Sequence, residues 1–418
     1  MSTPWAHRFA QRTKSVKSST IRELLKLTQR PEVISFAGGL PAPDVFPVER
    51  FETACHRVLE AKGAMALQYS ASEGYTPLRE YLAQKMAKYG IIAGPDNVLI
   101  TSGSQQALDL IGKLLINPGD RILLEAPTYL GALQAFNVYG AEYVSVPVDH
   151  DGLRTGELEE ALRSGPKFMY VLPNFQNPGG VTLCEPRRHE LVLLADKYGI
   201  PVIEDDPYGQ LRFEGEHLPP LLVLDRDNLR RDDGKLGNVI YLSTFSKTLA
   251  PGIRLGWMVA PPDVISKLVQ LKQGADLHTS TFDQMVAYEV VHDGFLDEHV
   301  KKIRAVYRER RDVMLAALTE YFPPEVSWTH PQGGLFLWVT LPEGLEMEHL
   351  FQAALRENVA FVPGDCFYAT GDEGRRHMRL NFSHSNPQQI REGIRRLGLA
   401  VAREMAAHQP RVLTGVER

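Results

Sequence analysis

A single lysine lies in a segment rich in hydroxyl groups, the run STFSKT at 243–248, which stands between two apolar runs. A lysine that is desolvated beside other cations can have a pKa of about 7–8, at which its amine serves as a nucleophile and a general base. The hydroxyls of Thr244 and Ser246 and the guanidinium of Arg254 are groups that bind phosphate. The segment therefore predicts a reactive amine at Lys247 beside a phosphate site, whereas the alternative is a solvated loop lysine.

A second candidate for phosphate binding is the run TSGSQQ at 101–106, where a predicted strand gives way to a predicted helix. Gly103 allows a tight turn, and Ser104 and Gln105 place donors at the start of the helix. Free backbone amides at a helix N-terminus attract anions. The alternative for this fragment alone is an ordinary capped helix.

Two further polar clusters follow predicted strands. Asp205 and Tyr208 belong to the run EDDPY at 204–208, and Asn177 belongs to the turn NFQNPGG at 174–180. Ligands of open α/β sheets bind at the carboxyl ends of strands, so these side chains are candidates for a binding site. An acid in that position can ligate a metal, pair with a buried cation or cap a helix. Because no His or Cys cluster accompanies it, no metal is expected.

The elements that must position these residues are predicted from hydrophobic patterning. Short apolar runs are typical of buried strands, and amphipathic stretches lie between them. This alternation predicts an α/β fold with a mostly parallel central sheet flanked by helices. The predicted strands are 98–101, 121–124, 168–172, 201–204, 239–243 and 256–260, and the helices between them include 105–115 and 187–198. The charged segment 225–237 is predicted to be a surface loop.

The pattern changes after about residue 262 and indicates a small α+β C-terminal domain. Helices are predicted at 264–273, 282–292, 296–321, 350–357 and 387–405, with strands at 333–339 and 377–383. We predict an N-terminal arm and substrate-covering helix over 1–45, a large domain over 46–295 and the small domain over 296–418. Residues 8–22 are basic and rich in Ser and Thr, as in organellar transit peptides, but Ser19 can cap a short helix and favours an ordered arm.

Composition excludes several classes of protein. Among 418 residues, 46 Lys and Arg against 51 Asp and Glu give a formal charge of -5, which argues against a nucleic-acid binder. No apolar run approaches the roughly 18 residues of a membrane helix. The three scattered cysteines indicate neither a disulfide framework nor a CxxC site. A cytoplasmic protein with reduced thiols is therefore expected.

A reactive lysine, a phosphate cradle and a strand-end acid are the groups that pyridoxal 5'-phosphate (PLP) requires. With these motifs the chain resembles the fold-type I, class I/II aminotransferases, and more narrowly the branch of 2-aminoadipate aminotransferase and kynurenine aminotransferase II. The motifs that carry the finer resemblance are STIRELLKLTQRP (19–31), SFAGGLPAP (35–43), LQYSASEGYTPLR (67–79), TSGSQQALDL (101–110), FQNPGG (175–180), EDDPY (204–208) and QGADLHT (273–279).

The resemblance implies a role for each matching residue. Lys247 is implied to hold the cofactor and to move the substrate proton, Asp205 to pair with the pyridinium nitrogen, and Tyr129 to stack on the ring. Asn177 and Tyr208 are implied to hydrogen-bond the phenolic oxygen. The implied phosphate ligands are Ser104, Gln105, Thr244, Ser246, Arg254 and, from the neighbouring subunit, Tyr69. A homodimer with shared active sites is thereby implied.

The resemblance also implies the substrate side of the site. Arg379 is implied to clamp the substrate α-carboxylate, although a surface arginine at a strand end is an equal alternative from sequence. Asn177, Ser19 and Gly39 are implied to lie near the substrate, and Arg22 to meet a distal carboxylate. The expected substrates are 2-aminoadipate, glutamate, and leucine or aromatic amino acids, with 2-oxoglutarate as acceptor in a ping-pong reaction.

Two other functions are weighed against transamination. A PLP-dependent lyase or decarboxylase shares the cofactor motifs and differs only in the substrate pocket. A DNA-binding regulator with an aminotransferase-like domain needs a winged-helix module ahead of it, whereas the resemblance here begins near residue 18. The charge balance also disfavours the regulator.

Overall fold

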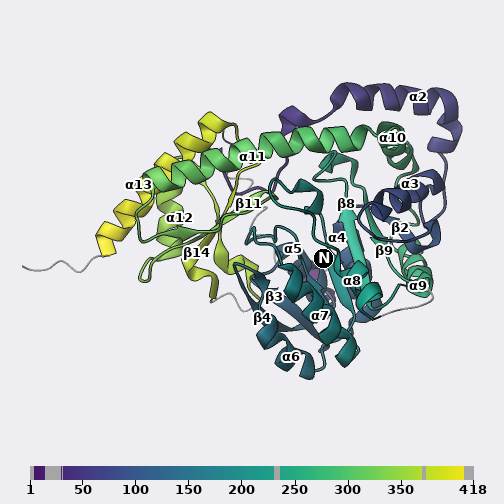
Figure 1. Ribbon diagram of the computed structural model, residues 1–418, viewed down its shortest axis with the longest axis horizontal. Helices are drawn as coiled ribbons and strands as arrows, with labels where there is room; N and C mark the ends of the chain where they lie inside the picture. Colours follow the sequence, from purple (N-terminus) through teal and green to yellow (C-terminus); the bar gives the residue numbers. More distant parts are fainter. Residues whose placement is uncertain (1–3, 15–29, 31, 230–235, 370–372, 409–418) are drawn as a thin grey trace, which may run out of the picture.

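A computed structural model describes residues 4–14, 30, 32–229, 236–369 and 373–408 (Figure 1). Within these ranges the central sheet has eight strands in the order β2-β9-β8-β7-β6-β3-β4-β5. Their bounds in that order are Val98–Thr101, Gly256–Val259, Val239–Thr244, Val202–Asp205, Met169–Val171, Arg121–Ala126, Glu142–Asp149 and Gly152–Leu153.

Most strands of this sheet are apolar on both faces because both faces are covered. In β2, Val98 and Ile100 belong to one hydrophobic core, and Leu99 between them belongs to another. Successive side chains of a strand point to opposite faces, so the two cores lie on opposite sides of the sheet. This arrangement confirms the predicted α/β class with helices on both faces.

Seven helices of the described chain contribute to the core that contains Val98: α2 (Val48–Ala66), α3 (Thr76–Ala87), α6 (Thr155–Arg163), α7 (Glu185–Tyr198), α8 (Leu221–Asn228), α10 (Thr281–Val291) and the start of α11 (Phe295–Tyr321). Three helices contribute to the core that contains Leu99: α4 (Ser104–Leu115), α5 (Leu130–Asn137) and α9 (Pro262–Gln273). The predicted strands and helices of this part of the chain agree with these bounds to within a few residues.

One edge of the sheet collects the polar motifs. β8, β7, β6, β3 and β4 run parallel, and β9 is antiparallel to both of its neighbours, β2 and β8. The carboxyl ends of β2, β3, β6, β7 and β8 therefore share one edge. Gly103 follows β2, Tyr129 follows β3, Asn177 follows β6, Asp205 ends β7 and Lys247 follows β8. Residues that are far apart in sequence thus meet where ligands of such sheets bind.

A smaller antiparallel sheet has the order β10-β11-β14-β13, formed by Ser327–Trp328, Phe336–Thr340, His377–Asn381 and Val362–Pro363. Its helices are α11 (Phe295–Tyr321), α12 (Met347–Arg356) and α13 (Pro387–His408). Figure 1 shows α11 extending from α10 beside the large sheet to α13. The N-terminal strand β1 (Ile34–Ser35) pairs with β12 (Val359–Ala360) of this region. The division at residues 45 and 295 stays a prediction.

The prediction of a surface loop over 225–237 is wrong at its start. Asp225 belongs to α8, is 2 % exposed and accepts a hydrogen bond from the backbone of Asn238. The helix forms there because the buried Glu204 carboxylate accepts from the first two backbone amides of α8, those of Leu221 and Leu222. Residues 230–235 lie outside the described residues, as do Ser19, Arg22 and the helix predicted around them.

No helix within the described ranges combines the length and the apolar character needed to cross a membrane. The cytoplasmic location stays a prediction from composition.

Candidate active site

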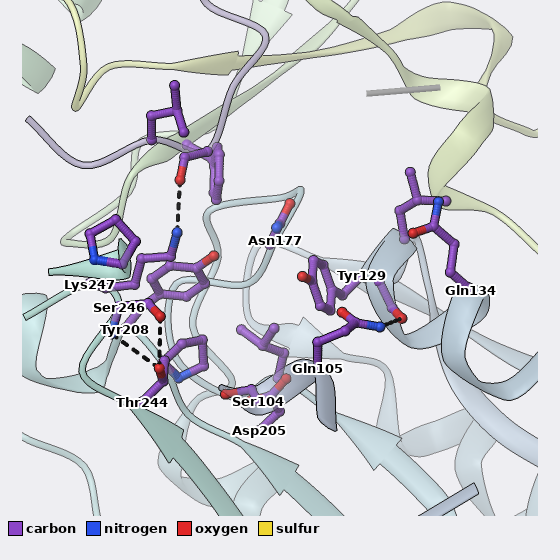
Figure 2. A pocket seen from close by; sticks show the side chains of 18 of the residues that line it. Ser104, Gln105, Tyr129, Gln134, Asn177, Asp205, Tyr208, Thr244, Ser246 and Lys247 are labelled. Carbon is purple, nitrogen blue, oxygen red and sulfur yellow. Dashed lines mark hydrogen bonds between the residues drawn. The ribbon is translucent and has the colours of Figure 1, made fainter. Parts of the chain in front are cut away.

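A cavity of about 580 Å³ opens at the carboxyl edge of the large sheet, where the small sheet packs against it (Figure 2). It brings together most of the residues that the sequence singled out. Those that line it are Gly39, Ser104, Gln105, Tyr129, Asn177, Asp205, Tyr208, Thr244, Ser246, Lys247, Arg254 and Arg379. Tyr69 does not line it, and its side chain is 79 % exposed.

Lys247 reaches the cavity from the turn that follows β8. Its Nζ donates a hydrogen bond to the carbonyl oxygen of Gly39 at 2.8 Å. Burial, reinforced by the guanidinium groups of Arg379 and Arg254, lowers the pKa of Lys247 to about 8. Desolvation and like charge both disfavour the ammonium form. About a tenth of this amine is therefore neutral and nucleophilic at pH 7, far more than of a lysine with the ordinary pKa.

This lowered pKa predicts how the cofactor-free protein takes up an aldehyde. A neutral amine attacks a carbonyl and an ammonium group does not, so the rate of PLP capture should rise with pH and level off above about 8. An amine with an ordinary pKa of about 10.4, such as a blocked lysine measured in parallel, should continue to gain rate up to about pH 10. Stopped-flow absorbance over pH 6–10 makes the comparison. A protein rate that tracked the blocked lysine would contradict the lowered pKa.

Asp205 is the buried acid of the site, with 1 % of its surface exposed. Its Oδ2 accepts a hydrogen bond from the hydroxyl of Tyr170 at 2.8 Å, whereas its Oδ1 has no partner in the described chain. Burial raises the pKa of Asp205 to about 7, and the nearby Asp206 adds to this rise. A carboxylate in this environment is stabilised by a cation placed at its free oxygen.

The turn predicted to bind phosphate depends on a close approach of two glycines. Gly103 has a φ of 79°, a conformation that favours glycine, and it precedes α4 directly. A Cβ at Gly103 would lie 2.6 Å from Nη2 of Arg254. A Cβ at Gly256 would lie 2.8 Å from the backbone nitrogen of Ser104, so the start of β9 packs directly on this turn. The tight contact places Arg254 beside the first amides of α4.

The hydroxyl groups of the lysine segment lie on the same side of the cavity. The Thr244 hydroxyl donates to the backbone oxygen of Leu255 at 2.8 Å and lies 2.9 Å from the Ser246 hydroxyl. The Gln105 amide donates to the backbone oxygen of Gly131 at 2.9 Å. Ser104, at the first turn of α4, has a buried hydroxyl without a partner in the described chain. Hydroxyls, a guanidinium and a helix N-terminus together form an anion site.

Arg379 lies on β14 and enters the cavity from the small sheet. It is 1 % exposed, which excludes the alternative of a surface arginine. Its guanidinium donates to Asn177 Oδ1 and to the backbone oxygen of Ala37, both at 2.7 Å, and lies 4.3 Å from the ring centroid of Phe336. Its Nε has no partner in the described chain. Burial lowers the pKa of Arg379 to about 10, so the group stays cationic at neutral pH.

These groups fit PLP and its amino acid substrate. Three buried polar atoms of the cavity lack a partner in the described residues, and they differ in chemistry: a carboxyl oxygen of Asp205, the hydroxyl of Ser104 and a cationic nitrogen of Arg379. They match, in turn, a pyridinium nitrogen, a phosphate and a carboxylate. With the amine of Lys247 among them, the donor set is the one that a PLP enzyme needs.

The fold and this cavity define a PLP-dependent transferase. The chain belongs to the family of class I and II aminotransferases, whose sequence profile matches residues 37–397. It is thus a PLP-dependent aminotransferase, and an amino acid and a 2-oxo acid are its substrates.

Individual relatives cover nearly the whole chain. Aromatic-amino-acid aminotransferase 1 of Thermococcus litoralis is 48% identical over 404 residues, covering 95% of this chain and 94% of the relative. The 2-aminoadipate transaminase of Thermus thermophilus is 47% identical over 398 residues, with 95% and 97% covered. The crystal structure of an alpha-aminoadipate aminotransferase from Thermus thermophilus, complexed with N-(5'-phosphopyridoxyl)-L-leucine, has a TM-score of 0.89 at 45% identity and covers 97% of this chain and 100% of that one.

Two residues of the site were not predicted from the sequence: Tyr170, which contacts Asp205, and Phe336, which packs on Arg379. A signal for Tyr170 existed. Tyr170 is a tyrosine in an otherwise apolar strand, and it is in register with Ile203 of the neighbouring strand. Asp205 lies two residues after Ile203, so its side chain points to the same face of the sheet as those of Ile203 and Tyr170. The carbonyl oxygen of Gly39 had no such signal, because backbone groups carry none.

Proposed function

We propose that this chain transfers the amino group of 2-aminoadipate or glutamate, and also of leucine or aromatic amino acids, to a 2-oxo acid such as 2-oxoglutarate in two half-reactions. The observation that carries the proposal is that a low-pKa amine, an unpaired buried acid and a buried guanidinium face one cavity. The substrate range rests on relatives named for aromatic amino acids and for 2-aminoadipate.

We assign the roles of the chain's own residues as follows. Bound PLP supplies the electron sink and carries the amino group between the half-reactions. Lys247 holds it through Nζ, and once that amine is free it removes and returns the substrate α-proton. Asp205 Oδ1 keeps a proton on the ring nitrogen, and Tyr129 stacks on the ring. Asn177 and Tyr208 hydrogen-bond the phenolic oxygen.

The remaining assignments concern the two anionic ends of the bound molecules. Arg379 binds the substrate α-carboxylate, with Asn177 and Gly39 beside it. The phosphate is bound by Ser104, Gln105, Thr244, Ser246 and Arg254. Each of these residues lines the cavity described above.

The proposed reaction is tested by one half-reaction followed by the other. Glutamate added to the PLP-loaded protein should change the visible absorption of the cofactor and release 2-oxoglutarate, and a second 2-oxo acid should restore the spectrum. Release of ammonia or carbon dioxide in place of a new amino acid would instead support the lyase or decarboxylase. An unchanged spectrum with bound cofactor would contradict amino transfer altogether.

The choice of side chain is tested at Arg22, which lies outside the described residues. A panel of donors and acceptors compares the wild type with Arg22→Ala. Selective loss of glutamate and 2-aminoadipate, with leucine retained, supports a contact between Arg22 and the distal carboxylate. An equal loss for all substrates contradicts that contact. Ser19 also lies outside the described residues, so its place near the substrate stays a prediction.

We expect Arg379→Lys to raise KM for the amino donor roughly 30-fold, since lysine loses the bidentate geometry worth about 2 kcal/mol. The bound cofactor's spectrum should stay unchanged, because Arg379 is assigned to the substrate and not to PLP. Arg376→Lys is the matched control: Arg376 lies three residues away, is half-exposed and pairs with Glu343 at 3.0 Å. Steady-state kinetics of both variants make the test. A wild-type KM in Arg379→Lys would remove the carboxylate role.

We further propose a homodimer in which Tyr69 reaches the cofactor phosphate of the partner. Support comes from its 79 % exposed side chain and from the neighbouring Leu67 and Met65, which are 76 % and 57 % exposed. Exposed apolar clusters mark association surfaces.

The shared site is tested with two inactive variants, Tyr69→Ala and Lys247→Ala. After their subunits are mixed and allowed to exchange, activity should recover to about a quarter of the wild-type value, because half of the dimers are mixed and each has one complete site. No recovery, with exchange verified by mass spectrometry, would place Tyr69 in its own subunit's site or in none.

A further inference from the structure

A second carboxylate lies directly behind the acid of the site. Asp206 follows Asp205 at the end of β7, and successive residues of a strand point to opposite faces. The contacts of Asp206 agree with this rule. Its carboxylate accepts hydrogen bonds from the Gly209 backbone nitrogen at 2.8 Å, from Asn174 Nδ2 at 3.0 Å and from the Tyr241 hydroxyl at 3.1 Å. Asp206 does not line the cofactor cavity.

Two of these contacts hold turns that carry cofactor-site residues. Gly209 directly follows Tyr208 and begins the short helix η5 (Gly209–Leu211). A Cβ at Gly209 would lie 2.5 Å from the Asp206 carboxylate, so the backbone approaches as closely as a glycine allows. Asn174 begins the turn that carries Asn177. One carboxylate therefore joins the Tyr208 turn to the Asn177 turn.

The far side of this link is anchored in the protein interior. Asn174 Oδ1 accepts from Arg188 Nη2 at 2.6 Å. Arg188 is fully buried and also donates to the backbone oxygens of Leu183, Pro173 and Pro219. A buried and fully connected polar network of this kind holds its members in one arrangement. The Asn174 side chain is thus fixed at both ends.

The charge of Asp206 also acts on the site. Its negative charge contributes to the raised pKa of Asp205, and the same charge favours a positive charge on a ring nitrogen placed at Asp205. The titratable and charged groups that act on Asp206 from the surrounding elements are Glu204, Asp205, Arg188, Arg212, His217, Tyr89 and Tyr241.

We propose that Asp206 is a positioning residue for amino transfer. Its carboxylate holds Tyr208 and Asn177 so that both meet the phenolic oxygen of the cofactor, and its negative charge helps Asp205 to keep the ring nitrogen protonated. The proposal rests on the proposed roles of Asp205, Asn177 and Tyr208, and it adds a residue that touches neither cofactor nor substrate.

The test is Asp206→Asn in the PLP-loaded enzyme, because asparagine keeps the size of the side chain but loses the charge and one acceptor oxygen. The asparagine Oδ1 can still accept from Gly209 and Asn174, but these hydrogen bonds lose the strength that the negative charge gives them, and the two turns loosen. Weaker hydrogen bonds from Tyr208 and Asn177 to the phenolic oxygen raise the affinity of that oxygen and the Lys247 nitrogen for the proton that they share. The midpoint of the spectral pH titration should therefore move upward by about half a pH unit or more, and kcat should fall roughly tenfold. A role confined to stability would leave the midpoint unchanged.

The matched control is Asp225→Asn. It alters a buried carboxylate in α8 that, like Asp206, accepts a backbone hydrogen bond, at 2.9 Å from Asn238, and lies outside the cavity lining. We expect it to keep the wild-type midpoint. Asn174→Ser shortens the side chain that donates to Asp206 and changes no charge, so it should raise the midpoint of the spectral titration by a smaller amount. This variant serves as the test if Asp206→Asn does not fold.

Wild-type midpoints in Asp206→Asn, or in Asn174→Ser where the first variant is lost, overturn the proposal. So does a shift in Asp225→Asn as large as that in Asp206→Asn. Failure of the proposed function is separate from these results, since it shows in the wild type as a cofactor spectrum that glutamate does not change.

Discussion

Lys247→Ala is expected to lower kcat by about ten-thousandfold or more, the largest effect of any substitution in this chain. The amine is assigned both to covalent attachment and to proton transfer, and positioned acid–base catalysis alone contributes about 10²–10⁴-fold. The position supports both tasks: Nζ lies in the cavity, donates a hydrogen bond to a backbone oxygen and has a pKa of about 8. No other lysine lines the cavity within the described chain.

Three measurements check this expectation. Steady-state assays give kcat, borohydride reduction with peptide mapping shows which side chain carries the cofactor, and equilibrium dialysis shows whether PLP still binds. The phosphate cradle should retain PLP in the variant, so activity should vanish without loss of binding. A label on a different lysine, or activity within about tenfold of the wild type, would contradict the assignment.

Lys85→Met is the matched control, because Lys85 is also buried, at 5 % exposure, and pairs with Asp297 at 2.9 Å away from the cavity. Losing one partner of that pair should lower the thermal midpoint and leave kcat within about threefold of the wild type. The contrast separates loss of a reactive amine from loss of a buried cation.

Asp205→Asn is expected to lower kcat/KM by about 10²- to 10³-fold. Asparagine fits the same space and can still accept from Tyr170, but it cannot balance a cation at the ring nitrogen. An unpaired buried charge costs about 3–5 kcal/mol, and about 1.4 kcal/mol corresponds to a tenfold rate. The ring nitrogen is then expected to lose its proton, and with it most of the electron sink.

Tyr170→Phe provides a graded comparison, because it removes only the hydroxyl that donates to Asp205 at 2.8 Å. We expect a loss of about tenfold, which corresponds to about 1.5 kcal/mol, the lower end for one hydrogen bond to a charged group. Both variants are measured by single-turnover kinetics with glutamate, which report the proton-transfer step directly. Equal losses in the two variants would mean that Asp205 acts through its hydrogen bond and not through its charge.

Hydrophobic patterning was sufficient for the elements that carry the site. β2, β8 and β7 were predictable because they are buried on both faces and read as continuous apolar runs. β4 was not predicted, because most of its residues are only half-buried and so form no continuous apolar run. It also contains Pro147, and proline is rare within strands because it lacks a backbone N–H. The start of 225–237 was misassigned because the capping of α8 depends on Glu204, 17 residues earlier in the chain.

The candidate site divides in the same way. Lys247, Asp205 and Ser104 were identifiable because each has a distinctive residue type at a strand end or helix start. Arg379 was ambiguous until its burial was known, since the sequence does not show that β14 brings it beneath Phe336 and beside Asn177. Asp206 and Tyr170 act through side-chain contacts between neighbouring strands and loops.

The sequence by itself therefore determined which chemistry this chain can perform, because an amine, a phosphate cradle and a strand-end acid are written in local motifs. Only the tertiary structure decided how that chemistry is assembled. It showed that Arg379 faces the cavity, that Asp205 points into the cavity whereas Asp206 contacts the turns outside it, and that Lys247 meets the carbonyl oxygen of Gly39. The physical reason is that these choices depend on strand order, on the face to which a side chain points and on burial. These features arise from contacts between residues that are as much as 342 positions apart in the sequence, as in the hydrogen bond from Arg379 to the backbone oxygen of Ala37.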